Sequence, residues 1–283
     1  MSNAQHSGYY FAPPSKWPVV GSTALFFLAI GGVLLMNSHG IGWVPFGIGF
    51  FILVYMLFGW FGTVIRESEG GLFNAQVDMS FRWAMGWFIF SEVMFFAAFF
   101  GALWYARQYS IPWLGDIDNK LLWPEFKAHW PTAGPYRPPE FSPMHAWGIP
   151  AINTLLLLSS GVTVTWAHWA LKKGDRGNLI FGLFLTILLG IIFLSLQAYE
   201  YSHAYSELNL KLTSGVFGST FFMLTGFHGF HVTLGVTMLI VILFRCVAGH
   251  FKPDHHFGFE AVSWYWHFVD VVWLLLFIFV YWV

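Results

Sequence analysis

Residues 179–199 read LIFGLFLTILLGIIFLSLQAY, a stretch without a charged side chain. About twenty apolar residues in a helix cross a hydrocarbon core of roughly 30 Å, so this stretch predicts a transmembrane helix. Runs of similar length lie between charges elsewhere in the chain. Together they predict seven spans: 17–36, 41–65, the run between Arg82 and Arg107, 144–171, 179–201, 216–244 and 259–283.

The composition supports a membrane protein. Of the 283 residues, 57% are hydrophobic and only 10% are charged, which leaves too few polar side chains to cover a water-soluble globule of this size. The formal net charge of -1 excludes an electrostatic nucleic-acid binder, which needs a basic surface. A single Cys246 excludes an intrachain disulfide framework and a multi-thiolate metal cluster.

The predicted fold is an all-α membrane protein with seven transmembrane helices. Backbone groups in lipid must be hydrogen-bonded within their own segment, and the alternation typical of barrel strands is absent. We expect a helical hairpin at 17–66, followed by a five-helix bundle at 79–283 with an external loop at 108–143. Residues 1–16 are expected to be a cytoplasmic segment without a cleaved signal peptide, because no basic region precedes an apolar core.

Lysine and arginine side chains predict the orientation. Those expected on the amino-terminal side of the membrane are Lys16, Arg66, Arg82, Lys172, Lys173, Arg176, Arg245 and Lys252. Those expected on the other side, mostly at the long loop, are Arg107, Lys120, Lys127, Arg137 and Lys211. Because cytoplasmic loops carry the excess of basic residues, we expect a cytoplasmic amino terminus and, after seven spans, a periplasmic carboxy terminus.

Two carboxylates are predicted to lie inside the membrane. Glu92 is ten residues past Arg82, which places it about 15 Å into the bilayer, and Asp270 has the same spacing from Glu260. A charged carboxylate there is costly, so each is a candidate for a structural or gating contact or for a proton relay. His267 is three residues before Asp270, so the two can share a hydrogen bond, and a polar contact between helices is the favoured role of Asp270.

Several histidines are candidates for metal binding or proton collection. His228 and His231 have helical spacing, but two imidazoles form an incomplete metal site, so bonding to helices or lipid headgroups is favoured. His255 and His256 precede the last span and form a possible proton-collecting surface, with interfacial hydrogen bonding as the simpler role.

Three charged residues close spans on the predicted cytoplasmic side: Arg66, Glu67 and Arg245. A cationic side chain at that depth is suited to extend towards a phosphate headgroup, and Arg can bind one with two hydrogen bonds. Ordinary anchoring explains each residue singly, whereas a specific lipid site requires the three to converge.

The chain lacks a haem-attachment CxxCH motif, paired cysteines for a two-copper centre and a nucleotide-binding loop. We therefore expect no catalytic residue and no metal or other cofactor in this chain. A partner of a catalytic subunit is favoured over a catalyst. An independent proton or ion carrier is an alternative, motivated by Glu92 and Asp270, although no pair of broken helices supports it.

The last span and several shorter motifs resemble the subunit III family of cytochrome c oxidases. The strongest are HHFGFE at 255–260 and WYWHFVDVVW at 264–273. Others are WP at 17–18, VIRES at 64–68, SEVMFF at 91–96, TWAH at 165–168, GDR at 174–176 and the segment from GSTFF at 218–222 to His231. The resemblance covers nearly the whole chain.

The resemblance implies a hairpin splayed from the bundle, with phospholipids in a V-shaped cleft that Arg66, Glu67, Arg245 and His231 face. It also implies that the chain packs directly on subunit I, which carries haems and copper, and that subunit II is a further partner. Cytochrome c is expected to dock through another subunit. The resemblance implies that the chain supports the stability of subunit I, proton uptake and oxygen access past Glu92. The expected location is the bacterial cytoplasmic (inner) membrane.

The sequence departs from the family pattern in two places. Trp169 stands where many relatives have a second histidine after His168, so a role of that pair is not carried over. The loop at 108–143 is longer than in mitochondrial relatives, which leaves its contacts open. A quinol oxidase or a nitric oxide reductase is an alternative complex, although related subunits there usually lack the first hairpin.

Overall fold

The computed structural model describes residues 10, 12–135 and 140–282, and these form helices joined by turns and loops. Seven helices of the described part are long and apolar enough to cross a membrane, which confirms the predicted fold class. They are α1 (Trp17–Met36), α2 (Trp43–Glu69), α3 (Ala75–Tyr105), α5 (Ile149–Lys172), α6 (Arg176–Ser206), α7 (Gly215–Ala248) and α8 (Phe257–Leu276).

Two helix starts differ most from the predicted ones. Helix α3 begins at Ala75 and includes Arg82, whose Nε donates to Asp78 Oδ2 at 2.7 Å, one turn earlier in the same helix. The fourth span begins at Ile149 rather than at 144. Gly148 has a φ of 137°, which breaks the chain direction, and Pro150 occupies the first turn, where a missing N–H costs nothing.

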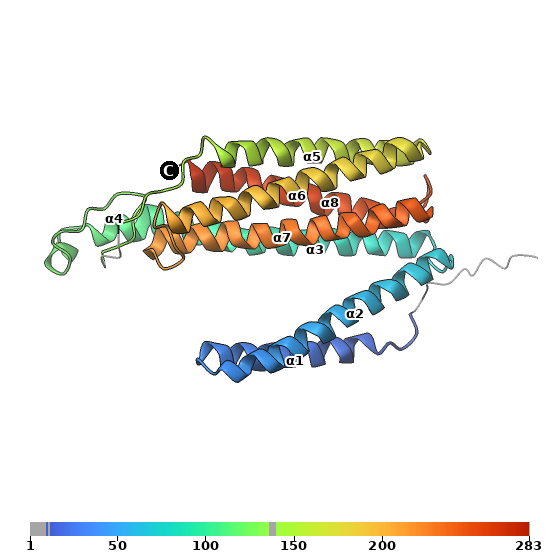
Figure 1. Cartoon of the computed structure of the whole chain (residues 1–283), viewed down its shortest axis with the longest axis horizontal. Coiled ribbons are helices and arrows are strands. Elements are labelled where there is room, and N and C mark those ends of the chain that lie inside the picture. The colour runs from blue at the N-terminus through green and yellow to red at the C-terminus, as the bar shows by residue number, and fades with distance from the viewer. Residues whose placement is uncertain (1–9, 11, 136–139, 283) are drawn as a thin grey trace, which may run out of the picture. The chain divides into compact units, whose positions relative to one another are not determined.

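The chain forms two compact units, residues 1–83 and 84–283. In the first unit, α1 and α2 form an antiparallel hairpin (Figure 1). A β-carbon on Gly31 would lie 2.5 Å from the Phe46 nitrogen, and one on Gly49 would lie 2.7 Å from the Leu28 nitrogen. Glycines therefore let the two backbones approach closely, which is how helices associate in lipid.

In the second unit, α8 runs through a bundle with α5, α6, α7 and the remainder of α3 (Figure 1). Trp266 of α8 is fully buried, and its indole Nε1 donates to Ser160 Oγ of α5 at 2.9 Å. A β-carbon on Gly190 or on Gly235 would lie less than 3 Å from that indole ring. Small residues on α6 and α7 thus make room for the largest side chain of the core.

The loop at 108–143 is fixed to the loop before α7. It begins with a π-helical turn at Ala106–Ser110 and the short helix α4 (Ile111–Leu114), and a 3₁₀ turn follows at Asn119–Leu121. Ser142 N donates to the Leu208 carbonyl at 3.0 Å, and Val216 N donates to the Ala133 carbonyl at 3.2 Å. Residues 136–139 of this loop, Arg137 among them, lie outside the described residues, as do residues 1–9 and 11 of the amino-terminal segment.

Candidate functional site

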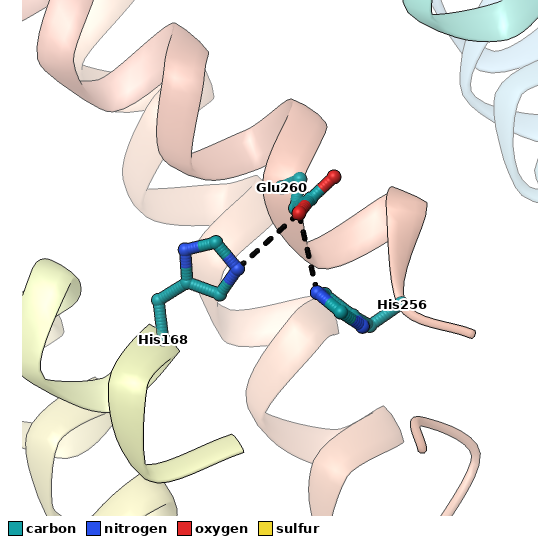
Figure 2. A group of neighbouring side chains, drawn as sticks. All are labelled: His168, His256 and Glu260. Atoms are coloured by element: carbon teal, nitrogen blue, oxygen red, sulfur yellow. Dashed lines mark ion pairs between the residues drawn. The ribbon is translucent and has the colours of Figure 1, made fainter. Parts of the chain in front are cut away.

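A cluster of His168, His256 and Glu260 lies where the end of α5 meets the start of α8. Figure 2 shows both imidazole rings facing the Glu260 carboxylate. Glu260 Oε1 lies 3.5 Å from His168 Nε2 and 3.2 Å from His256 Nε2. The exposed fractions of these side chains are 18% for His168, 9% for His256 and 11% for Glu260. One ring nitrogen of each histidine and one oxygen of Glu260 all lie within 4.8 Å of one another.

Local structure explains why these side chains meet. His168 lies one turn before α5 ends at Lys172, and His256 immediately precedes α8. Glu260 is in the first turn of α8, where the helix dipole favours a carboxylate. Its i, i+4 spacing from His256 puts both on one face of the helix.

The cluster was only partly predictable. The structure separates the two neighbouring histidines of the predicted proton-collecting surface, since His255 is exposed and His256 faces Glu260. The HxxxE spacing of His256 and Glu260 is a local signal that the sequence analysis did not use. His168 is far away in sequence, and only the packing of α5 on α8 brings it there.

Glu92 and His231 form a second polar contact, between α3 and α7. Glu92 Oε2 lies 3.0 Å from His231 Nε2. The other ring nitrogen, Nδ1, donates to the Phe227 carbonyl at 2.6 Å, because a carbonyl oxygen can only accept. Nε2 and Oε2 therefore need one shared proton to make a favourable contact. The roles predicted for Glu92 as a relay and for His231 as a lipid contact remain predictions.

Asp270 differs from the expectation. His267 Nε2 lies 3.2 Å from Thr165 Oγ1 on α5, and no hydrogen bond joins His267 to Asp270, both of which are in the described part of the chain. Asp270 Oδ1 is buried without a hydrogen-bond partner. The bond that the spacing allowed is not formed because the imidazole turns to the neighbouring helix, which spacing along one helix cannot show.

Glu200 is a further buried carboxylate that the sequence analysis did not single out. It has no exposed surface, and the Tyr281 hydroxyl donates to its Oε1 at 2.6 Å. Because Glu200 falls at the end of a long apolar run, it resembles an interfacial residue in the sequence. Its position three residues after Gln197, which puts two polar side chains on one face of a helix, was the signal available in the sequence.

The other predicted residues have separate surroundings. His228 Nε2 donates to the Val269 carbonyl at 3.2 Å, so this imidazole bonds a helix. Arg66 Nη2 donates to Thr63 Oγ1 at 3.2 Å, and the Arg245 guanidinium lies 4.4 Å from the centre of the Phe251 ring. Arg66 and Glu67 belong to the first unit and Arg245 to the second, so a common lipid site remains a prediction.

Comparisons with known proteins give one family. The family profile described as Cytochrome c oxidase subunit III matches residues 6–283. The chain is 42% identical over 281 residues to cytochrome c oxidase subunit 3 of Chondrus crispus, covering 99% of this chain and 95% of the relative. It is 41% identical over 283 residues to the proteins of that name from Marchantia polymorpha, covering 100% and 98%, and Papio hamadryas, covering 100% and 99%. The chain therefore belongs to the cytochrome c oxidase subunit III family.

Proposed function

We propose that this chain is a cofactor-free, non-catalytic subunit of a proton-pumping cytochrome c oxidase and packs directly on the haem- and copper-bearing subunit I. Likeness to subunit 3 proteins over at least 99% of the chain carries the proposal, since it extends through every predicted span. Family membership implies a haem-copper oxidase complex with other subunits. We propose that subunit II is one of these partners and that cytochrome c docks on the complex through a subunit other than this chain.

The polar contacts inside the bundle support a non-catalytic role. Glu92 bonds His231, Glu200 accepts from Tyr281, and His267 bonds Thr165, so each contact joins two different helical segments of the bundle. Contacts of this kind hold helices together in lipid. We infer that they stabilise the bundle against which subunit I packs, and that they thereby sustain proton uptake during turnover.

Lipid binding is a separate part of the proposal. Arg66, Glu67 and Arg245 would bind phospholipid headgroups near the cytoplasmic face of a bacterial inner membrane, with acyl chains offering oxygen an apolar route. The supporting features are the basic side chains at the ends of α2 and α7. Mass spectrometry of the lipids retained by the Arg66→Gln and Arg245→Gln complexes tests this, because a specific site would lose a defined lipid from each.

Copurification tests the main proposal. The chain carries an affinity tag, the membranes are solubilised in mild detergent, and haem and copper are measured in the eluate. We expect a haem- and copper-bearing chain to elute with it, and a two-copper centre in a partner would exclude a quinol oxidase or a nitric oxide reductase. A folded chain that elutes without any haem protein would overturn the proposal.

A further inference from the structure

We propose that His168, His256 and Glu260 form a binding site for a divalent zinc-like cation at the junction of α5 and α8 (Figure 2). Two imidazole nitrogens and one carboxylate oxygen are a donor set that zinc accepts in proteins. Magnesium and calcium prefer sites built only from oxygen, so this donor set disfavours them. The inference does not rest on the proposed function, because cation binding is measured independently of oxidase activity.

The hydrogen bond of His256 shows which ring nitrogen is protonated. His256 Nδ1 lies 3.1 Å from the Lys252 carbonyl oxygen, which can only accept, so Nδ1 must hold a proton. In the neutral ring, Nε2 then has a bare lone pair that faces the Glu260 carboxylate at 3.2 Å. Two acceptors face each other there, and a cation between them would remove the conflict. A backbone carbonyl bonded to the far nitrogen is also the usual way of orienting a metal-binding histidine.

His168 brings a second imidazole nitrogen to the same carboxylate. Its Nε2 faces the same carboxylate oxygen, Oε1, at 3.5 Å, and it is buried without a hydrogen-bond partner. This nitrogen is therefore close enough to the carboxylate to share a cation with it, and no hydrogen bond in the described part of the chain occupies it. The Glu92 and His231 pair differs, because its two atoms stand 3.0 Å apart in a one-to-one contact that a single proton satisfies.

The distances fit a tetrahedral ion. Ligand atoms about 2.0–2.1 Å from a tetrahedral zinc lie about 3.3–3.4 Å from one another. Glu260 Oε1 lies 3.2 Å and 3.5 Å from the two nitrogens, and the nitrogens lie within 4.8 Å of each other. A small closure of the rings would complete three corners of the tetrahedron. A water molecule would complete the coordination, as it does in other zinc sites with three protein ligands.

Metal analysis of the intact detergent-solubilised complex tests the site. Complexes containing wild-type chain, His168→Asn, His256→Asn or Glu260→Gln are stripped with EDTA, dialysed against buffered zinc and analysed by mass spectrometry for metal content. We expect the wild type to bind about one zinc per chain more than each variant. Since loss of an outer contact already lowers zinc affinity roughly 10- to 100-fold, removal of a ligand should lower it at least as much.

His255→Asn is the matched control, because this exposed histidine lies beside the cluster but not in it, and it should keep the wild-type zinc content. Zinc-edge absorption spectra of the wild type should show imidazole scattering that the variants lack. The yield and the thermal midpoint in EDTA check that each variant is folded. If a histidine variant fails to assemble, the near-isosteric Glu260→Gln variant tests the zinc site in its place. Equal zinc in wild type and Glu260→Gln, or loss of zinc in His255→Asn, would overturn the proposal.

Discussion

At the scale of single residues, the hydroxyl of Tyr281 is the bond that makes Glu200 tolerable inside the bundle. Tyr281→Phe removes that donor and leaves a fully buried carboxyl group without it. We expect the variant complex to lose about 1–3 kcal/mol of stability, the usual cost of a buried group left unsatisfied. The thermal midpoint of the purified complex measures the effect. Tyr199→Phe, on an exposed side chain of the same region, should leave the midpoint unchanged.

Glu92→Gln separates a structural contact from a proton relay. The glutamine amide can donate a hydrogen bond to His231 Nε2 in place of the shared proton, so assembly should persist. We expect the initial rate of oxygen consumption to change by less than about two-fold, whereas loss of an essential proton-transfer group would cost roughly 10²–10⁴-fold. Oxygen electrode traces with the amount of complex matched by haem content give the answer, and a collapse of turnover would establish a relay.

Residues differ in how far the sequence predicts them. Glu92 and Asp270 were predictable because each interrupts an apolar run. The free-energy cost of a carboxylate in hydrocarbon is enough to single them out as candidates. Their surroundings were not predictable, since His231, which contacts Glu92, and Thr165, which contacts His267 in place of Asp270, lie on helices distant in sequence. Spacing along one helix predicts which residues share a face, but it does not predict which neighbouring helix packs against that face.

At the scale of the helix pair, the α1–α2 hairpin depends on close backbone contact. A β-carbon on Gly31 would lie 2.5 Å from the Phe46 nitrogen, whereas one on Gly32 would have no atom within 4 Å. Gly31→Ala should therefore force the helices apart at a cost of about 1–3 kcal/mol, as for other overpacked sites. Gly32→Ala is the matched control and should be neutral. Proteolysis of the purified complex should cut the hairpin faster only in Gly31→Ala.

Asp175 caps the amino terminus of α6 and makes its contribution depend on pH. Its Oδ1 accepts from Asn178 N at 3.1 Å, and this bond, with a second from the Asn178 side chain, lowers the pKa of the Asp175 carboxyl below its ordinary value. The carboxylate thus stabilises the fold above the unfolded pKa of about 3.9, and that stability is lost as pH falls through the lower folded value.

Asp175→Asn keeps a capping side chain but removes the charge, so it isolates this effect. We expect the difference in thermal midpoint between wild type and Asp175→Asn to be constant near neutral pH and to shrink below about pH 4. Asp254→Asn, in an exposed turn, provides the comparison. A difference that stays the same down to pH 3 would contradict the assignment.

Element lengths explain why the fold was predictable and its boundaries less so. Hydrocarbon thickness sets the number of apolar residues, so seven runs gave seven helices. The positions of the helix ends depend on local contacts and on the interface region. Helix α3 begins before Arg82, which pairs with Asp78 one turn earlier, and α6 continues to Ser206 past the apolar run. A helix can extend beyond the hydrocarbon into the interface.

At the scale of the whole chain, the asymmetry of basic residues predicts which end faces the cytoplasm. Lys173 follows α5 and Lys120 lies in the loop after α3, so they should emerge on opposite sides. With Cys246 replaced by Ser, we expect Lys173→Cys to react with an impermeant maleimide only in inside-out vesicles and Lys120→Cys only in right-side-out vesicles. The reversed pattern would place the amino terminus outside and would contradict the charge rule for this chain.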